Sequence, residues 1–363
     1  MLAGYFVEGL WTAQKDWTRA KRLSEESMLQ LIQNRGAQTR LGCTFLPEKI
    51  DDWNSSANSL QILQYCVETL HIKDIRFGLR WNKVEKNGNI DLAYYASLLE
   101  YMHKHKVKIT LNIGPVKTAL WPETYVPQSV ATLNDLPKRS KITPDDLVGK
   151  AALLYLARLL KELKKQVYWK SITMIQPENE SYNYFGDTEW IVSDEYLSKV
   201  IQVIRRHYSG KILLNSSGTF DLSQIKNFLH AYPQKNLTVG LDYYYTADSL
   251  YKILWTRGFD HVTNRKHPFG YGLKDFLQKY HLGLEVTEAQ YEPWNRATHP
   301  GSSLQELNWL LLRCLRFFQP SQDALIRLWG IEQLIARQLQ NTPFPDDQKQ
   351  IDLIQKINKA RKN

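Results

Sequence analysis

The sequence predicts an α/β fold, a single (β/α)8 or TIM barrel, and three observations support this prediction. The chain has 363 residues, and α/β barrels are the usual way to arrange a chain of this length around one core. Short runs rich in β-branched residues alternate with amphipathic helical patterns, which indicates parallel βαβ units. Eight such runs occur along the chain, which is the number of strands in this barrel.

The eight runs are the expected barrel strands. Each is short, largely apolar and separated from the next by loop and helical residues. They cover residues 41–45, 74–79, 107–113, 171–176, 211–215, 238–244, 282–287 and 324–329. A doubly wound open sheet is the alternative fold, and it has less support because no Gly-rich phosphate loop follows any of these runs.

Helical patterns lie between the expected strands, and no linker rich in Gly, Pro or Ser divides the chain. We therefore expect one domain, with an N-terminal helical extension over residues 1–40 packed on a barrel over residues 41–363. The helical patterns cover residues 15–34, 59–71, 92–106, 147–166, 195–208, 304–318 and 348–362.

Composition excludes several classes of protein. Apolar residues make up 43% of the chain and charged residues 23%, which is typical of a globular protein and not of a disordered or fibrous one. No apolar run approaches the roughly 18 residues that a membrane-spanning helix needs. The first residues lack a basic segment, and Glu8 interrupts their apolar stretch, so no signal peptide is expected. Cys43, Cys66 and Cys314 form no CxxC pair, so we expect a cytoplasmic protein without disulfides.

The net charge of +10 raises the possibility of a nucleic-acid partner. The basic residues are dispersed, however, and clusters such as residues 161–170 and 356–362 are interpreted as helix faces or ends. We expect neither a nucleic acid nor a membrane as partner, although the charge would also suit an anionic glycan. The nine histidines include no HExxH or HxxEH motif, so no metal and no other cofactor is expected.

Two glutamates follow apolar strands and are the principal candidates for catalysis. Glu180 comes after the fourth expected strand and Glu288 directly after the seventh. The carboxyl ends of all strands of such a barrel meet at one rim, where active sites are built. Two carboxylates across a pocket are what cleavage of a glycosidic bond requires, because one protonates the leaving oxygen and the other attacks the anomeric carbon or activates water.

Other residues near these positions have alternative interpretations. Glu178 could share the facing of Glu180 and is a minor candidate for the acid/base. Glu285 is interpreted as structural and paired with an arginine. Glu332 is interpreted as a residue of a helix start that could also touch a sugar hydroxyl. Residues 215–218, Asn-Ser-Ser-Gly, are interpreted as a turn, because no partner for a serine nucleophile is evident.

Asn179-Glu180 after an apolar strand resembles the Asn-Glu signature of the clan A glycoside hydrolases, whose Glu is the general acid/base. The surrounding residues 175–180 are similar to the strand-four motif of retaining β-galactosidases and cellulase-like enzymes of that clan. Thr287-Glu288 resembles the strand-seven nucleophile motif. The resemblance extends to the clan and not to one family within it.

The resemblance also implies substrate-binding residues on the other strands. Further matches lie at strands two, six and eight and in the residues after strand seven; the implied residues are Arg76, Trp81, Asn179, Tyr244, Gln290, Trp294 and Trp329. By this resemblance, Arg76 and Tyr244 would hydrogen-bond the nucleophile. Trp329 would form the floor of the subsite for the cleaved sugar. Two departures are visible: Asp242 stands where the clan has Asn, and Asn112 and Lys117 stand near a frequent His of strand three.

The sequence therefore predicts a retaining β-glycoside hydrolase that acts by double displacement on a β-linked oligosaccharide or glycoside. Glu288 must be ionised to attack, and Glu180 must start protonated and later act as base. The two carboxylates are expected about 5–5.5 Å apart, the separation of retaining enzymes. Two alternatives stay open: a carbohydrate-binding barrel without hydrolysis, and a transglycosidase with the same site.

Overall fold

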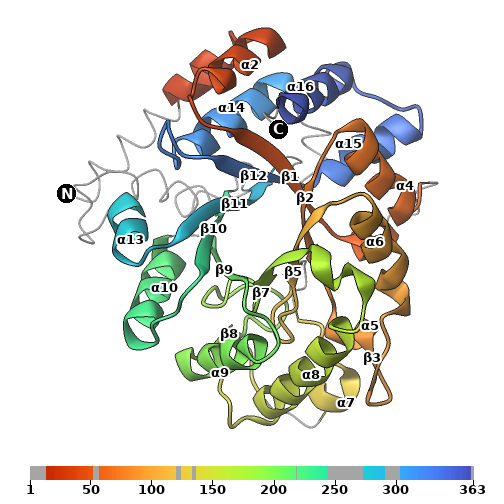
Figure 1. Cartoon of the computed structure of the whole chain (residues 1–363), viewed down its shortest axis with the longest axis vertical. Coiled ribbons are helices and arrows are strands. Elements are labelled where there is room, and N and C mark those ends of the chain that lie inside the picture. Colours follow the sequence, from red (N-terminus) through yellow and green to blue (C-terminus); the bar gives the residue numbers. More distant parts are fainter. Residues whose placement is uncertain are drawn as a thin grey trace. The chain divides into compact units, whose positions relative to one another are not determined.

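The computed structural model describes residues 14–51, 57–119, 124–132, 136–217, 219–243, 273–290 and 303–360. Eight strands form a closed barrel in the order β1-β12-β11-β10-β9-β7-β5-β2 (Figure 1). The registers of the β1–β12, β11–β12, β5–β7 and β7–β9 pairs are all parallel. The barrel prediction is confirmed, and the open-sheet alternative is wrong.

The barrel strands lie within a few residues of their predicted positions. They are β1 (Thr39–Phe45), β2 (Asp74–Gly78), β5 (Lys108–Asn112), β7 (Ile172–Gln176), β9 (Lys211–Ser216), β10 (Leu237–Tyr243), β11 (Gly283–Gln290) and β12 (Ala324–Trp329). Two small sheets accompany the barrel, one of β3 (Glu85–Lys86) with β4 (Asn89–Ile90) and one of β6 (Lys141–Ile142) with β8 (Ile191–Val192).

Helices occupy most of the connections between the strands. They are α2 (Glu25–Gln33), α3 (Pro47–Asp51), α4 (Ser59–Gln64), η1 (Tyr65–Thr69), α5 (Trp81–Val84), α6 (Ala93–Lys104), α7 (Gln128–Ala131), α8 (Leu147–Leu163), η2 (Val167–Ser171), α9 (Asp194–Arg205), α10 (Thr219–Ala231), α13 (Leu273–Lys279), α14 (Leu304–Leu315), α15 (Ile331–Leu339) and α16 (Asp347–Lys359). Within the described ranges, none of the helices is long and apolar enough to cross a membrane.

The chain forms two compact units whose boundaries fall inside barrel strands. The first unit consists of Met1–Ile75 and Leu241–Asn363, and the second of Arg76–Gly240. One boundary lies within β2 and the other within β10, so each unit carries a run of consecutive barrel strands. The division into an extension over residues 1–40 and a barrel over residues 41–363 stays a proposal.

In the first unit, the C-terminal helix α16 is tied to the first barrel strand. The side chain of Asn358 accepts the N–H of Leu41 through Oδ1 and donates Nδ2 to the carbonyl oxygen of Leu70, each at 3.0 Å. Both ends of this buried amide are therefore satisfied, as a buried polar group requires. Helix α2 packs against α16, so both end regions of the chain contribute to this unit.

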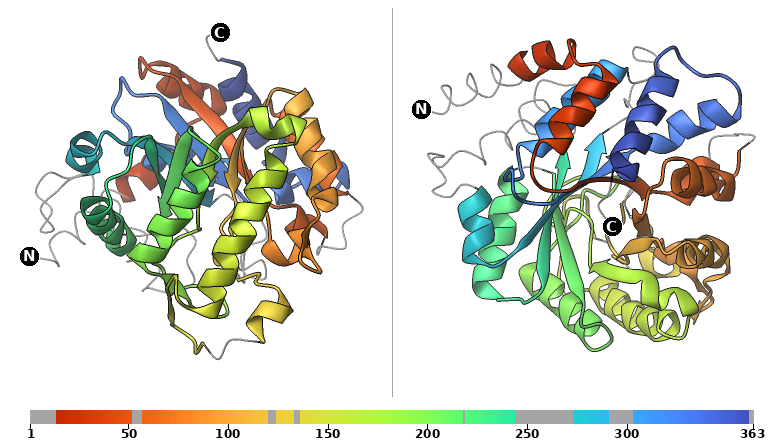
Figure 2. Two further views of the ribbon diagram at one scale, coloured as in Figure 1. Left: turned by 60° about the horizontal axis from the view of Figure 1, so that its bottom comes forward. Right: turned by 45° about the horizontal axis from the view of Figure 1, so that its top comes forward.

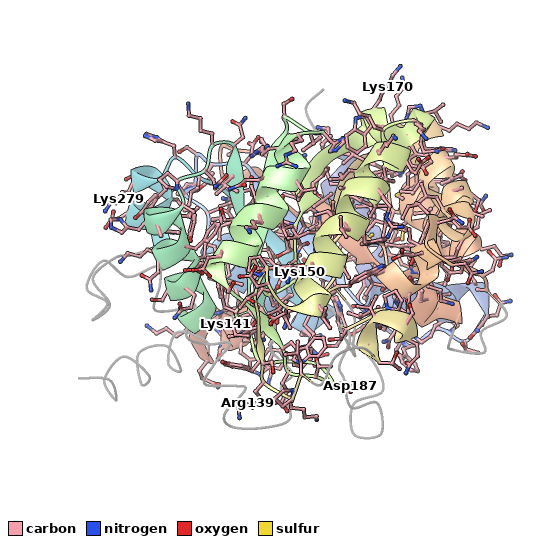
Figure 3. All side chains as sticks on the ribbon, turned by 90° about the horizontal axis from the view of Figure 1, so that it is seen from below. Arg139, Lys141, Lys150, Lys170, Asp187 and Lys279 are labelled. Carbon is pink, nitrogen blue, oxygen red and sulfur yellow. The ribbon has the colours of Figure 1, made fainter. Side chains whose placement is uncertain are left out.

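In the second unit, α8 and α9 pack side by side (Figure 2). Helix α8 buries side chains at spacings of three and four residues, including Val148, Ala152, Tyr155 and Leu159, which is the period of an amphipathic helix. The exposed basic residues of this unit include Lys141, Lys150 and Lys170, of which Lys170 lies apart from the other two (Figure 3). The interpretation of the basic charge as dispersed stays a prediction.

The predicted helix over residues 15–34 is wrong in its continuity. One helix covers residues 14–20, and α2 begins only at Glu25. Ser24 is the N-cap of α2, and its hydroxyl accepts the N–H of Ser27 at 3.2 Å. A serine side chain that satisfies a backbone N–H favours a helix start over a helix interior.

The helix at residues 14–20 is held to α14 by a buried carboxylate. Asp16 is 3% exposed and accepts from Arg313 Nη1 at 2.8 Å and from Arg316 Nη2 at 2.5 Å. Burial alone would raise the pKa of Asp16, but the hydrogen bonds from Arg316 and Arg313 outweigh burial and lower it. The ion pairs of Asp16 with Arg313 and Arg316 therefore stabilise the folded state at neutral pH.

We predict that Asp16→Asn lowers the free energy of unfolding by about 3 kcal/mol at pH 7, because it leaves the buried Arg313 guanidinium without its carboxylate. Since the folded pKa lies below the unfolded value, this contribution is present above about pH 4 and is lost as the pH falls further. Urea unfolding at pH 7 and at pH 3 measures both effects. The control is Glu162→Gln, which removes an exposed pair with Lys165 and should cost about 1 kcal/mol or less; an equal loss in both variants would contradict the prediction.

Candidate active site

Glu180 lies just after β7, in a backbone conformation that glutamate rarely adopts. Its φ angle is +41°, in the left-handed region, and its side chain is nearly completely buried. The N–H of Glu180 donates to Oδ1 of Asn215 at 2.9 Å. A residue other than glycine keeps a left-handed backbone only where the surrounding structure stabilises it, and such residues are frequent at functional sites.

The carboxylate of Glu180 is oriented by an amide three residues later. Nδ2 of Asn183 donates to Glu180 Oε2 at 2.7 Å and to Ser217 Oγ at 2.9 Å. The N–H of Asn183 in turn donates to the carbonyl oxygen of Glu180 at 2.9 Å. The side chain of Glu180 is thus fixed by the segment that follows it.

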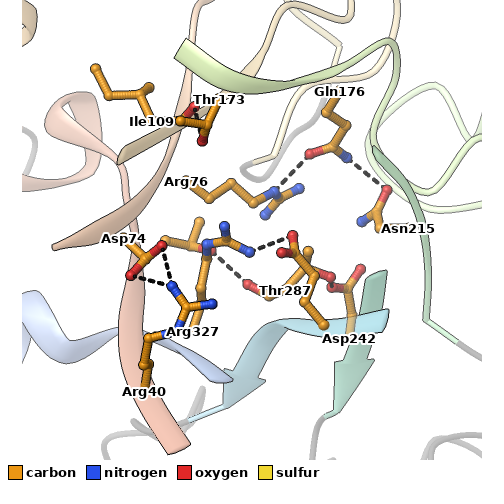
Figure 4. Close-up of polar contacts among 12 residues, drawn as sticks. Arg40, Asp74, Arg76, Ile109, Thr173, Gln176, Asn215, Asp242, Thr287 and Arg327 are labelled. Atoms are coloured by element: carbon orange, nitrogen blue, oxygen red, sulfur yellow. Dashed lines mark hydrogen bonds and ion pairs between the residues drawn. The ribbon is translucent and has the colours of Figure 1, made fainter. Parts of the chain in front are cut away.

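Asn179 belongs to a buried network of amides around Arg76. Arg76 Nε donates to Gln176 Oε1 at 2.7 Å (Figure 4), and Arg76 Nη2 donates to Asn179 Oδ1 at 2.6 Å. Asn215 Nδ2 also donates to Asn179 Oδ1 at 2.8 Å, and Asn215 Oδ1 accepts from Gln176 Nε2 at 2.7 Å. Because the oxygen of Asn179 is held as an acceptor by two donors, its Nδ2 is fixed as the donor end.

Glu178 is the other carboxylate at this strand end, and its contacts are internal. It accepts the N–H of Lys117 at 2.7 Å and the hydroxyl of Tyr196 at 3.1 Å. Complete burial outweighs these donors and raises the pKa of Glu178 to about 8. A side chain at Gly114 would place its Cβ 2.7 Å from the Cα of Glu178, so the two chain segments meet in a space that admits only glycine.

Glu288 lies in β11 at an irregularity of the strand. Val286 pairs with Ile326 and Ala289 with Leu328, so β11 has one more residue than β12 across this interval. Such a bulge bends a strand and redirects a side chain, and bulges are frequent beside active sites. Glu288 is 4% exposed, which is unusual for a carboxylate.

Polar residues of the same unit surround this part of β11. Thr287 donates Oγ1 to Asp242 Oδ1 at 2.5 Å, and its carbonyl oxygen accepts from Thr44 Oγ1 at 2.8 Å. Asp242, which stands where the resembled clan has Asn, is therefore an acceptor for Thr287. Gln290, at the end of β11, is completely buried.

Two further glutamates of this unit have the structural roles that the sequence indicates. Glu285 forms an ion pair with Arg327 of β12, as predicted. Glu332 lies in the first turn of α15, and its Oε1 accepts the N–H of Leu46 at 3.3 Å. Burial raises the pKa of Glu332, Lys49 opposes this effect, and the charge of Glu288 adds slightly to it.

The predicted aromatic contacts have different outcomes. Trp329 ends β12, is partly exposed, and has Lys49 Nζ 4.0 Å from its ring centroid. Trp81 is completely buried; its ring stacks on Tyr155 with the centroids 4.8 Å apart, and its Nε1 donates to Glu85. This packing covers the ring, and the assignment of Trp81 to the substrate site stays a prediction. Tyr244 and Trp294 lie outside the described residues.

Four residues around Glu180 were not predicted from the sequence, namely Gln176, Asn183, Asn215 and Ser217. The prediction of a turn over residues 215–218 does not hold for Asn215, which lies in β9 and hydrogen-bonds Gln176, Asn179 and Glu180. A polar residue that ends an apolar strand was the available signal, since such positions reach the rim where barrel sites are built.

In the described part of the chain, no group of three or more His, Cys, Asp or Glu residues could hold a metal ion.

The fold is shared with solved structures of low sequence identity. No family model and no curated protein matches the chain. A GH5-4 broad specificity endoglucanase from Clostridium longisporum is 12% identical, with 92% of this chain and 99% of that chain covered and a TM-score of 0.51. The corresponding endoglucanase from Clostridium cellulovorans is 12% identical, with 93% and 97% covered and a TM-score of 0.54. At these identities the similarity establishes the barrel fold.

We predict that Glu178→Gln flattens the dependence of stability on pH. The folded carboxyl keeps its proton up to its pKa of about 8, whereas an unfolded glutamate loses it near its ordinary pKa of about 4.3. The folded state therefore binds more protons in this interval, and the free energy of unfolding of the wild type falls as the pH rises through it. At about 1.4 kcal/mol per pH unit of separation, the fall amounts to a few kcal/mol.

Urea unfolding at pH 5, 6.5 and 8 measures this difference, because glutamine cannot ionise. The variant should lose less stability than the wild type between pH 5 and 8. Parallel pH curves for the two proteins would show that Glu178 is ionised in the folded state.

Proposed function

We propose that this protein is a retaining β-glycoside hydrolase of clan A in which Glu288 is the nucleophile and Glu180 the general acid/base. The observation that carries the proposal is the burial of two carboxylates at the ends of β7 and β11. Burying a carboxylate is unfavourable unless the charge is held by specific partners, and the carboxyl ends of parallel barrel strands are where the active sites of this fold are built.

The arrangement around Glu180 supports the proposal from the side of substrate binding. Asn179 has its amide oxygen held by Arg76 and Asn215, which makes Nδ2 the donor end of this side chain. A donor to the sugar 2-hydroxyl strengthens in the transition state of glycoside cleavage. Two solved structures that share the fold over nearly their whole length are named as endoglucanases, which is consistent with a β-linked oligosaccharide or glycoside as substrate.

The proposed reaction has two displacements. Glu180 donates its proton to the glycosidic oxygen while a carboxylate oxygen of Glu288 attacks the anomeric carbon, so that the C–O bond to the leaving sugar breaks and a glycosyl ester of Glu288 forms. Glu180, now ionised, then takes a proton from a water molecule, whose oxygen attacks the same carbon and releases Glu288. Two inversions at one carbon give net retention.

Further contacts are proposed on the same basis. Gln290 and Trp329 would line the sugar subsite, with Trp329 as its apolar floor, because a flat ring packs well against a sugar. Arg76 would position the reacting groups through Asn179. Tyr244 and Trp294 remain candidates by resemblance.

We predict that Glu288→Ala lowers kcat on aryl β-glycosides by a factor of roughly 10⁴ or more, because the covalent intermediate can no longer form. Azide, which fits the space left by the carboxylate, should partly restore turnover. A panel of nitrophenyl β-glycosides, assayed with and without azide, measures both effects. Unchanged activity in the variant would remove Glu288 from the mechanism, and a wild type that binds these sugars without cleaving them would favour a carbohydrate-binding barrel.

We predict that the loss caused by Glu180→Ala depends on the leaving group. It should be small for the formation of the glycosyl ester from dinitrophenyl glycosides, which need little protonation, and about 10²–10⁴-fold for poor leaving groups. The matched control is Glu178→Gln, a change of the neighbouring buried carboxylate that should not produce this dependence. A uniform loss across leaving groups in Glu180→Ala would count against its role as acid.

A further inference from the structure

The segment after Glu180 folds back onto the carboxylate, and this return is held by a buried charge. Lys117 is 1% exposed, and its Nζ donates to the carbonyl oxygens of Asn183 at 2.7 Å and Trp190 at 3.1 Å. The N–H of Asn179 donates to the carbonyl oxygen of Lys117 at 2.9 Å. Lys117 therefore holds the backbone at Asn179, next to Glu180, and at Asn183. The distance between Glu180 and Asn183 is set by these contacts.

Asn183 uses both hydrogens of its amide in this arrangement. One is directed to Glu180 Oε2 at 2.7 Å and the other to Ser217 Oγ, beyond the end of β9, at 2.9 Å. An amide that is anchored at a second point has a fixed direction, so its hydrogen bond to Glu180 is set in advance. A donor directed at one carboxylate oxygen favours the ionised form of that carboxylate.

This bond distinguishes the two oxygens of Glu180. Oε2 accepts the amide hydrogen of Asn183, which lowers the proton affinity of this oxygen relative to Oε1. The proton that glycoside cleavage requires is therefore favoured on Oε1. The donor also favours the ionised form that the second displacement needs, when Glu180 acts as base.

We propose that Asn183 is a positioning residue that holds Glu180 in its working orientation, assigns Oε1 as the proton-carrying oxygen and sets the balance between its acid and base forms. The inference rests on the proposed function for its kinetic consequences, but the hydrogen bond can be tested without turnover. Among the described residues, the charged and titratable groups around this segment include Lys117, which donates to the Asn183 carbonyl, Glu178, whose carboxyl accepts from Lys117 and Tyr196, and Arg76, which donates to Asn179.

The first test is a titration of the Glu180 carboxyl by carbon NMR of the full chain labelled at the glutamate side-chain carboxyl, with the resonance assigned by its loss in Glu180→Gln. In Asn183→Leu, which removes both donors at similar volume, we expect the titration midpoint to move up by about one pH unit. Asn183→Gln keeps an amide donor and should return the midpoint toward the wild type. Thr188→Val is the matched control, because the Thr188 hydroxyl contacts Thr124 and should leave the midpoint unchanged.

The second test uses the same variants on a nitrophenyl β-glycoside. The alkaline limb of kcat/KM should move up with the NMR midpoint in Asn183→Leu, with a loss of kcat of about tenfold and little change in KM. Asn183→Ala replaces the leucine variant in both tests if circular dichroism shows that the leucine variant does not fold.

The outcomes separate this inference from the proposed function. An unchanged NMR midpoint in a folded Asn183 variant overturns the inference, whether or not the enzyme is active. A loss of kcat without movement of the alkaline limb also overturns it, because misfolding of the segment would have that effect. A shifted midpoint in a protein without glycosidase activity would leave the positioning role of Asn183 in place and refute the proposed function.

Discussion

A buried positive charge organises the end of β7. Arg76 has no exposed surface, and two of its nitrogens are satisfied by the neutral oxygens of Gln176 and Asn179. A buried guanidinium is tolerated only where its donors find acceptors in the correct directions. The positions of Gln176, Asn179 and Asn215 therefore follow from the need to accommodate Arg76, and Glu180 takes its place from this network through the N–H bond to Asn215.

Both candidate carboxylates stand where regular strand geometry breaks down. Glu180 has a left-handed backbone directly after β7, and Glu288 lies in an interval where β11 has an extra residue relative to β12. A regular strand directs alternate side chains to the barrel interior and to the surrounding helices. The two irregularities release these residues from that alternation, while the strands on either side continue to pack the barrel.

The barrel could be predicted from sequence because its signals are local. All eight strands lie close to their expected positions, since each is a short apolar run flanked by helical patterns. The break at Ser24 was missed because a helical period on both sides of a capping residue looks continuous. The amide network was beyond prediction for a different reason: Arg76, Gln176 and Asn215 are far apart in the sequence, and asparagine and glutamine have no period or spacing that marks a partner. Trp81 was assigned to substrate by resemblance, whereas only the packing around Tyr155 reveals that its ring is covered.

The glycine at position 114 limits how this protein can diversify. Its Cα approaches the backbone of Glu178 so closely that no β-carbon fits between them, and the strand end that carries Glu180 begins at that contact. Replacement of Gly114 by any other residue would therefore displace the segment that carries Glu180. Sequence variation is restricted at this junction of the third and fourth barrel strands by the lack of space for a single carbon atom.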